Sequence, residues 1–371
     1  MNSNESYSAG QGGRAQLEAF GWNGFFEACF QSYDEPDTCP ARVAVEHGQT
    51  YRLYSQYGEL TAEVSGRLRH QSLSREDMPA VGDWVVIRPR LEEGRATIHQ
   101  VLPRRSRFAR KVAGSRSDEQ IVGTNIDTVF VVMSLNNDFN MRRLERYLAA
   151  TWDSGASPVI LLSKADLCYD VDVKRHEVEQ IALGVPVHTI SILQSTSLDV
   201  LTQYFGFGKT VAMLGSSGVG KSTLINLLAG SDIQKVRDIR LSDDRGRHTT
   251  THRELILLPQ GGLVLDNPGM RELQFWDAGE GLRETFDDIE SLAAECNFGD
   301  CAHAKEPYCA VREAIKRGTL DAARFESYKK LQKENDFLEL RRSVGAKVAE
   351  KSRWKKIMGS KRQKKKIKGE F

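Results

Sequence analysis

Residues 215–222 constrain the fold of this chain more than any other segment, because they read Gly-Ser-Ser-Gly-Val-Gly-Lys-Ser. They match the GxxxxGK[ST] pattern, in which glycines let backbone N–H groups curl around a phosphate at a helix N-terminus. The apolar run Thr210–Leu214 precedes the loop, and Thr223–Leu228 follows it as an expected helix. Lys221 is expected to reach the β- and γ-phosphates, and Ser222 to ligate Mg²⁺. The chain is therefore predicted to contain a mostly parallel α/β sheet that binds a nucleoside triphosphate.

A second motif, earlier in the chain, indicates the base. Residues 163–166 read Ser-Lys-Ala-Asp after the apolar run Val159–Leu162, and they match NKxD except that Ser163 replaces Asn. The Asp166 carboxylate can accept hydrogen bonds from guanine N1–H and N2–H₂, while the Lys164 stem covers the base plane. Adenine would leave that carboxylate unpaired, so the motif predicts GTP rather than ATP. It leaves open whether the shorter Ser163 still braces its loop.

Ser191-Ile192 is a candidate for the Ser-Ala element that usually accompanies this motif, although Ile192 departs from it. The residues predicted to contact GTP are Ser163, Lys164, Ala165, Asp166, Gly215, Ser216, Ser217, Gly218, Val219, Gly220, Lys221, Ser222 and Thr223.

Two segments after the loop carry groups suited to Mg²⁺ and the γ-phosphate. Asp266-Asn267-Pro268-Gly269 follows the expected strand Leu263–Leu265, so the Asp266 carboxylate can hold Mg²⁺ through water and the Gly269 backbone can sense the γ-phosphate. The polar stretch before that strand ends in Thr249, Thr250 and Thr251. A threonine hydroxyl there could complete the Mg²⁺ shell as part of an ordering switch loop. Together with Ser222, these residues form the predicted magnesium and switch set.

Hydrolysis requires a group that orients water, and small GTPases carry a Gln directly after the DxxG motif. This chain has Met270 at that position, so slow intrinsic turnover and activation by a partner are expected. His248 is the candidate replacement, because a neutral imidazole can orient water or accept its proton. The alternative is that His248 is a solvated loop residue. His248 and Lys221 are the predicted catalytic residues.

A cluster of nitrogen and sulfur ligands lies late in the chain. Cys296, Cys301, His303 and Cys309 fall within fourteen residues and suit one tetrahedral Zn²⁺. No ligand position stays open, so the site is expected to be structural and to fix a loop onto the helix Val311–Arg317. The alternative is three reduced cysteines with a surface histidine. Further on, Phe325, Tyr328, Leu331, Asn335 and Leu338 are expected on one face of an amphipathic helix.

The region before the nucleotide motifs has a different pattern. Short alternating runs from Ala41 to Val101, separated by turn signals, predict a small β-barrel; an OB-fold fits, and an SH3-like barrel stays open. The basic run Arg104–Lys111 contains Phe108 and suits either phosphate contact with base stacking or a solvated linker. Residues 1–38 are expected to be a flexible lead-in with a short helix near Leu17–Phe20.

The charge is polarised, although the formal total is only +2. Residues 341–371 hold thirteen Lys or Arg against two Glu, which favours a polyanionic partner, RNA rather than a membrane surface. No apolar stretch reaches the roughly 18 residues of a membrane span, and the N-terminus lacks a signal-peptide core. Six cysteines in 371 residues are too few for a disulfide scaffold, so a cytoplasmic location is expected.

The guanine motif precedes the phosphate loop, whereas ordinary GTPases place it after DxxG. In this order, and with the run Gly246-Arg247-His248-Thr249-Thr250-Thr251, the chain resembles the ribosome small-subunit-dependent GTPase A family of bacteria, from about Arg42 to about Lys366. Ser163, Ile192 and Asn267 depart from the family pattern.

The resemblance implies a multidomain fold. Its expected parts are an OB-fold barrel over 39–111, a circularly permuted P-loop GTPase domain over 112–280, a helical zinc-binding domain over 281–340 and a basic tail over 341–371. It also implies a GTPase that the small ribosomal subunit activates late in subunit maturation, with GTP favouring binding and hydrolysis favouring release. The expected partners are that subunit and its rRNA, with no membrane and a monomeric state. The resemblance assigns zinc to the four Cys and His positions and supports His248. Two alternatives stay open: an RNA-binding chaperone with incidental turnover, and a GTPase regulated by a protein or lipid surface.

Overall fold

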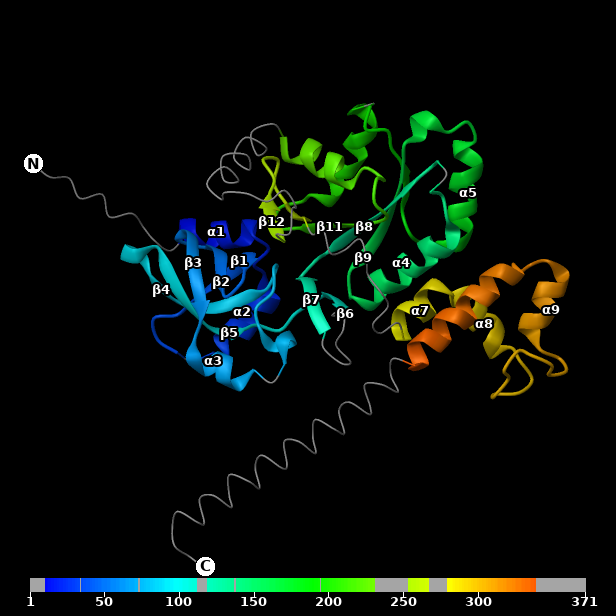
Figure 1. The fold of residues 1–371 in the computed structure, drawn as a ribbon, viewed down its shortest axis with the longest axis horizontal. Coiled ribbons are helices and arrows are strands. Elements are labelled where there is room, and N and C mark those ends of the chain that lie inside the picture. The colour runs from blue at the N-terminus through cyan, green and yellow to red at the C-terminus, as the bar shows by residue number, and fades with distance from the viewer. Residues whose placement is uncertain are drawn as a thin grey trace, which may run out of the picture.

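The computed structural model in Figure 1 describes residues 11–337 except 34, 73, 112–118, 137, 194, 231–252 and 267–278. A five-stranded barrel, an α/β domain and a group of helices follow one another along the chain. Among the described residues, no helix combines the length and hydropathy that crossing a bilayer would need.

Three strands of the barrel alternate between more and less buried side chains, and the other two each begin with a run of buried residues. Its strands are β1 (Cys39–His47), β2 (Thr50–Ser55), β3 (Gly58–Val64), β4 (Trp84–Arg90) and β5 (Arg95–Val101). They pair in the order β1-β2-β3-β5-β4, and β1 also pairs with β4, which closes the barrel. The β3–β5 pair is parallel. Its short helices are α3 (Gly66–Gln71), η1 (Arg75–Asp77) and η2 (Leu91–Glu93). Val43, Leu53, Ile87 and Ile98 fill the interior, so the predicted small β-barrel is confirmed.

The α/β domain contains six strands among the described residues, and three of them coincide with the apolar runs Val159–Leu162, Thr210–Leu214 and Leu263–Leu265. The strands are β8 (Thr128–Ser134), β9 (Ser157–Ser163), β10 (Val187–Thr189), β11 (Thr210–Leu214), β12 (Glu254–Leu257) and β13 (Leu263–Asp266). The order is β10-β9-β8-β11-β13-β12, and only β12 runs antiparallel to its neighbour β13. The helices are α4 (Met141–Asp153), α5 (Val171–Ile181), η3 (Ala165–Leu167), η4 (Ser195–Tyr204) and one over 221–230. Separate apolar clusters cover the two faces of the sheet.

Strand β1 also pairs with β12, so the barrel and the α/β sheet form one eleven-stranded sheet. Strands β6 (Arg107–Lys111) and β7 (Glu119–Thr124) form a separate hairpin between the two parts.

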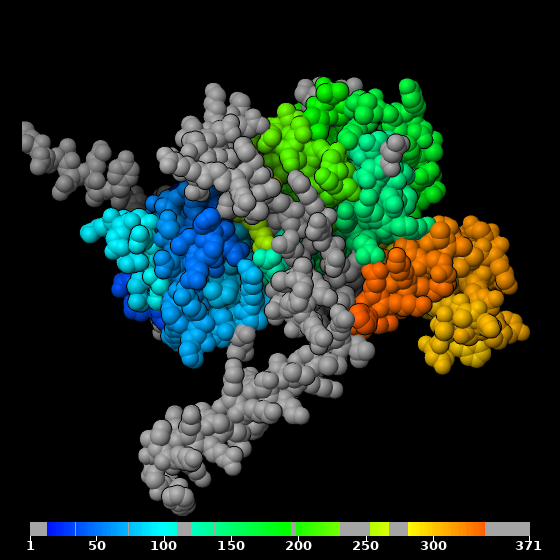
Figure 2. Space-filling view, viewed as in Figure 1, coloured from blue at the N-terminus to red at the C-terminus, as the bar shows by residue number. Residues whose placement is uncertain are grey.

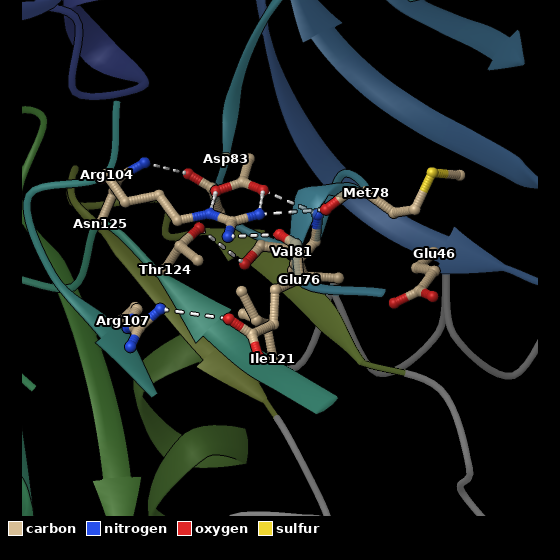
Figure 3. Close-up of polar contacts among 12 residues, drawn as sticks. Glu46, Glu76, Met78, Val81, Asp83, Arg104, Arg107, Ile121, Thr124 and Asn125 are labelled. Carbon is tan, nitrogen blue, oxygen red and sulfur yellow. Dashed lines mark hydrogen bonds and ion pairs between the residues drawn. The ribbon is translucent and has the colours of Figure 1, made fainter. Parts of the chain in front are cut away.

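The basic run that ends the barrel has a structural role that neither sequence interpretation anticipated. Arg104 donates to both carboxylate oxygens of the buried Asp83, from Nε to Oδ1 at 2.8 Å and from Nη2 to Oδ2 at 2.7 Å (Figure 3). It also donates to the carbonyl oxygens of Glu76 and Met78. Phe108 is buried in the core rather than available to stack on a base. Arg104 and Phe108 are therefore fixed by the fold.

The expectation of a flexible lead-in is wrong for residues 11–33. Helices α1 (Gln11–Ala19) and α2 (Gly24–Gln31) place Leu17, Phe20, Trp22 and Phe26 in the main core. The Trp22 ring lies edge-on to Trp84, with ring centroids 4.7 Å apart. This segment is ordered because its aromatic side chains are large enough for their burial to offset the entropy of fixing two short helices.

The helical part of the chain docks on α4. Its helices are α7 (Gly279–Thr285), α8 (Asp287–Ala294), α9 (Ala310–Arg317) and one over 322–337. Phe325, Tyr328, Leu331 and Asn335 are buried as the stripe predicts, and Leu338 lies outside the described residues. Figure 2 shows this part packed against the α/β domain, on the side away from the barrel. A Cβ on Gly281 would lie 2.1 Å from the Ala149 carbonyl oxygen, so the backbones of α7 and α4 touch.

A buried charge network holds this docking. Arg324 donates to Glu145 of α4 at 3.0 Å, to both oxygens of Asp288 and to the Thr285 carbonyl oxygen. Arg142 also donates to Glu145, at 2.6 Å. Glu145 is fully buried, so its negative charge is stabilised by these two arginines instead of by water.

Replacing Arg324 with Ala is expected to lower the free energy of unfolding by about 3–5 kcal/mol, because Glu145 then loses a buried partner. Urea denaturation measures this change. The control is Arg317→Ala, which removes an exposed pair with Glu313 and is expected to change little. Equal losses of unfolding free energy in the two variants would contradict the claim that the buried Arg324 network stabilises the fold.

Candidate nucleotide and metal sites

The predicted phosphate-binding loop lies at the end of the fully buried strand β11. Gly215 has φ +154°, and a Cβ there would lie 2.3 Å from the Val132 carbonyl oxygen. Gly218 and Gly220 also have positive φ, at +78° and +105°. The chain then enters the helix over 221–230 at Lys221. The loop curls as the glycine spacing predicts, because these backbone conformations suit glycine and disfavour other residues.

Lys221 lies inside this curl and is 9% exposed. Its ammonium group donates to the carbonyl oxygen of Gly215 at 2.6 Å and to that of Ser216. Ser217, Gly218, Ser222 and Thr223 are exposed around it. A lysine in this position can turn from the loop carbonyls to a phosphate on the open side of the loop.

The guanine motif and the phosphate loop are joined by a hydrogen bond that the sequence interpretation left open. Ser163, at the end of β9, is 1% exposed, and its Oγ donates to the Val219 carbonyl oxygen at 2.8 Å. A serine thus braces the two loops across 56 residues of chain. The structure brings together the two predicted GTP-contacting segments, 163–166 and 215–223.

The carboxylate expected to read the base is also held. Asp166 is exposed, and Ser191 Oγ donates to its Oδ1 at 2.5 Å. Lys164 adopts the left-handed conformation, φ +59°, and the Ala165 N–H donates to the Ile190 carbonyl oxygen at 3.2 Å. The Ile192 side chain approaches Gly220, where a Cβ would lie 2.8 Å from Ile192 Cδ1. The Ser191-Ile192 pair therefore contacts both loops.

The predicted magnesium carboxylate lies at the same edge of the sheet. Asp266 ends β13, which runs parallel to β11 with Ala212 opposite Leu265. Parallel neighbours place their carboxyl ends together, so Asp266 and the loop that starts at Gly215 share one edge. His248, Thr249, Thr250, Thr251 and Gly269 lie outside the described residues.

The four predicted metal ligands converge. The ligand atoms of Cys296, Cys301, His303 and Cys309 all lie within 4.8 Å of one another. The Sγ atoms of Cys296 and Cys309 are 3.9 Å apart, close to the roughly 3.8 Å that two sulfurs span around a tetrahedral Zn²⁺. His303 Nδ1 lies 3.4 Å from the Cys309 sulfur.

The surroundings of His303 suit a metal ligand. Partial burial lowers the pKa of His303, so its imidazole is neutral at physiological pH, the form that ligates metals. Its ring packs edge-on against Phe325, with centroids 6.0 Å apart. His303 and Tyr308 both have left-handed backbone angles, φ +56° and +57°, which let the short loop turn back on itself. The cluster could hold a metal ion.

Comparisons with known proteins agree with this geometry. The RsgA GTPase family model matches residues 101–276. An ABC transporter model matches residues 198–367, a span that includes the phosphate-binding loop. The chain is 46% identical to the small ribosomal subunit biogenesis GTPase RsgA of Opitutus terrae, over 96% of this chain and 99% of that protein. It is also 46% identical to RsgA 1 of Oceanobacillus iheyensis, over 88% and 93% of the two chains.

Two solved structures are similar over most of the chain. YjeQ from Thermotoga maritima has a TM-score of 0.60 at 25% identity and covers 80% of this chain and 98% of its own. YloQ, a circularly permuted GTPase, has a TM-score of 0.59 at 26% identity and covers 82% and 97%. Identity close to half, over nearly the full length of both chains, decides between the two family models. This chain belongs to the RsgA GTPase family.

Proposed function

We propose that the chain hydrolyses GTP to GDP and phosphate, and that the small ribosomal subunit activates it during late maturation of that subunit. The observation that carries this proposal is the Ser163–Val219 hydrogen bond, which holds a guanine-type motif against a phosphate loop. Relatives named for small ribosomal subunit biogenesis support the partner. In this proposal, GTP favours binding of the protein to the subunit, and GTP hydrolysis favours its release from the subunit.

The described residues suit each part of GTP binding. Asp166, braced by Ser191, accepts from guanine N1–H and N2–H₂, and the Lys164 stem covers the base. Backbone N–H groups of residues 215–223 surround the phosphates, and Lys221 exchanges the carbonyls of Gly215 and Ser216 for phosphate oxygens.

Mg²⁺, when bound, would neutralise the negative charge that develops on the transferring phosphoryl group. Ser222 and a threonine among Thr249, Thr250 and Thr251 are its proposed ligands, and Asp266 holds it through water. The Gly269 backbone senses the γ-phosphate. His248 orients the attacking water or accepts its proton.

We assign the remaining parts to attachment and stability. We assign residues 39–111 to an OB-fold, which is supported by the strand order β1-β2-β3-β5-β4 and its closure by the β1–β4 pair. This OB-fold and the basic tail over 341–371 are the proposed rRNA contacts. The proposed GTPase domain covers 112–280, and the proposed zinc-binding domain covers 281–340. One zinc ion in the Cys and His cluster is structural, because all four tetrahedral positions are filled by protein. The proposed molecule is a cytoplasmic monomer without a membrane partner.

The first test is GTP hydrolysis with and without purified small ribosomal subunits. We expect strong stimulation by small subunits and none by large subunits. Lys221→Ala should lower the stimulated rate by about 100-fold or more, because it removes the positive charge that stabilises the transferring phosphoryl group. Lys209→Ala is the matched control, since that exposed lysine lies at the opposite end of β11. Equal stimulation by both subunits would defeat the proposed partner.

Base recognition is tested by Asp166→Asn. We expect GDP affinity to fall by at least about 100-fold, because two charge-assisted hydrogen bonds are lost. Affinity for xanthosine diphosphate should rise, since the new amide can donate to the C2 carbonyl of xanthine. Fluorescent-nucleotide titration measures both affinities, and Asp170→Asn, at a neighbouring exposed aspartate, is the control. Unchanged nucleotide preference in the Asp166 variant would remove that residue from the base site.

The metal assignment is tested by elemental analysis of the purified chain. We expect about one zinc per chain in the wild type and in Cys168→Ser, and loss of zinc in Cys301→Ser. Chelation should lower the thermal midpoint of the wild type, because metal binding contributes to folding of the loop. A wild-type chain that carries no zinc and is insensitive to chelators would contradict a structural zinc.

A further inference from the structure

A row of four residues crosses from the barrel to the magnesium edge of the α/β sheet. In the pairing of β1 with β12, Val45 lies opposite Glu254. On the barrel side, Val45 lies opposite Arg52 of β2. On the other side, Glu254 lies opposite Asp266 of β13. We name Arg52, Val45, Glu254 and Asp266 the cross-sheet row. It connects the barrel to the predicted magnesium carboxylate through two intervening strands.

Side chains reinforce the row at the junction. Residues directly opposite each other in antiparallel strands project from the same face of the sheet, and here the Arg52 guanidinium reaches the Glu254 carboxylate. Both side chains are about three-quarters buried, with 26% and 22% exposed. The Tyr54 hydroxyl donates to the Leu255 carbonyl oxygen at 3.0 Å. Three strands therefore meet here through both backbone and side-chain contacts.

Arg253, which precedes Glu254 in the chain, also contacts the strands on the barrel side. Arg253 donates to the Ile121 carbonyl oxygen of β7 at 2.7 Å and lies 3.8 Å from a Glu46 carboxylate oxygen of β1. Arg253 and Glu254 follow directly after residues 231–252, which contain the predicted switch threonines. The chain thus leaves the predicted switch segment at a point that the barrel holds.

We propose that Arg52 and Glu254 are positioning residues that couple the barrel to the magnesium end of the nucleotide site. Strand β12 is only four residues long and pairs with β1 on one side and β13 on the other. A displacement of the barrel against the α/β domain is therefore transmitted through β12 to Asp266. By linkage, a nucleotide that fixes Asp266 and the switch also fixes the barrel. The inference rests on the proposed function and names how the partner acts on the site.

The chain offers a matched control for this idea. Arg52 Nε also lies 3.8 Å from a carboxylate oxygen of Glu59, which belongs to the barrel strand β3. Glu254→Gln removes the partner across the junction, and Glu59→Gln removes the partner within the barrel. Both changes keep side-chain size and affect the same arginine. Only the first should alter coupling.

The first experiment needs no ribosome. Hydrogen exchange is measured with Mg²⁺ and either GDP or a non-hydrolysable GTP analogue. We expect peptides that cover β1 and β2 to exchange differently in the two nucleotide states in the wild type and in Glu59→Gln. That difference should shrink to less than about half in Glu254→Gln. Identical exchange in both nucleotide states of the wild type would overturn the proposal, as would an equal loss in both variants.

The second experiment measures hydrolysis with and without small subunits. Glu254→Gln should keep its basal rate and its affinity for the subunit, but its stimulation should fall by about fivefold. The charge exchange Arg52→Glu with Glu254→Arg should restore most of it. Unchanged stimulation in Glu254→Gln, or no restoration by the exchange, would contradict the proposal. If small subunits do not stimulate the wild type, the proposed function fails, and hydrogen exchange still decides the coupling.

Discussion

The buried guanidinium of Arg42 is the interaction on which the arrangement of the N-terminal half depends. It is fully buried, and it donates to the carbonyl oxygens of Phe20, Gly82 and Asn125. Burial lowers the pKa of Arg42 to about 10, so the group stays charged at neutral pH and needs these acceptors. Because they come from the α1–α2 turn, the barrel and the segment before β8, one side chain fixes three parts of the chain. The N-terminal helices are therefore part of the fold.

The elements that could be predicted from sequence are those with local signals. The loop at 215–222 could be predicted because its glycines have backbone conformations that suit glycine. The buried stripe Phe325, Tyr328 and Leu331 could be predicted from the helical period. The spacing of the Cys and His residues predicted a cluster of ligand atoms, and the structure brings these atoms together. What could not be predicted depends on distant partners. The role of Arg104 requires Asp83, which the barrel buries, and the two N-terminal helices are too short for a clear periodic pattern.

The α/β domain has two structural neighbours, the barrel and the C-terminal helices. In sequence order, the C-terminal part follows directly after the motif that ends at Gly269. The structure adds contacts that sequence order cannot reveal. The C-terminal helices rest on α4, which leads into β9 and so to Ser163, while the barrel pairs with β12 beside Asp266. The barrel thus contacts a strand that begins beside Asp266, and the C-terminal helices contact the helix that precedes β9.

The hydroxyl of Ser163 has a chemical consequence for the purine ring. A serine hydroxyl can donate one hydrogen bond, and Ser163 donates it to the Val219 carbonyl oxygen. The side-chain amide of the asparagine in NKxD can donate two. That asparagine can brace the loop and still donate to N7, an acceptor on the imidazole ring of guanine. Ser163 can only brace. In the proposed base site, Ser163 offers N7 no donor, so a 7-deaza analogue, which lacks that acceptor, would lose no hydrogen bond to this residue.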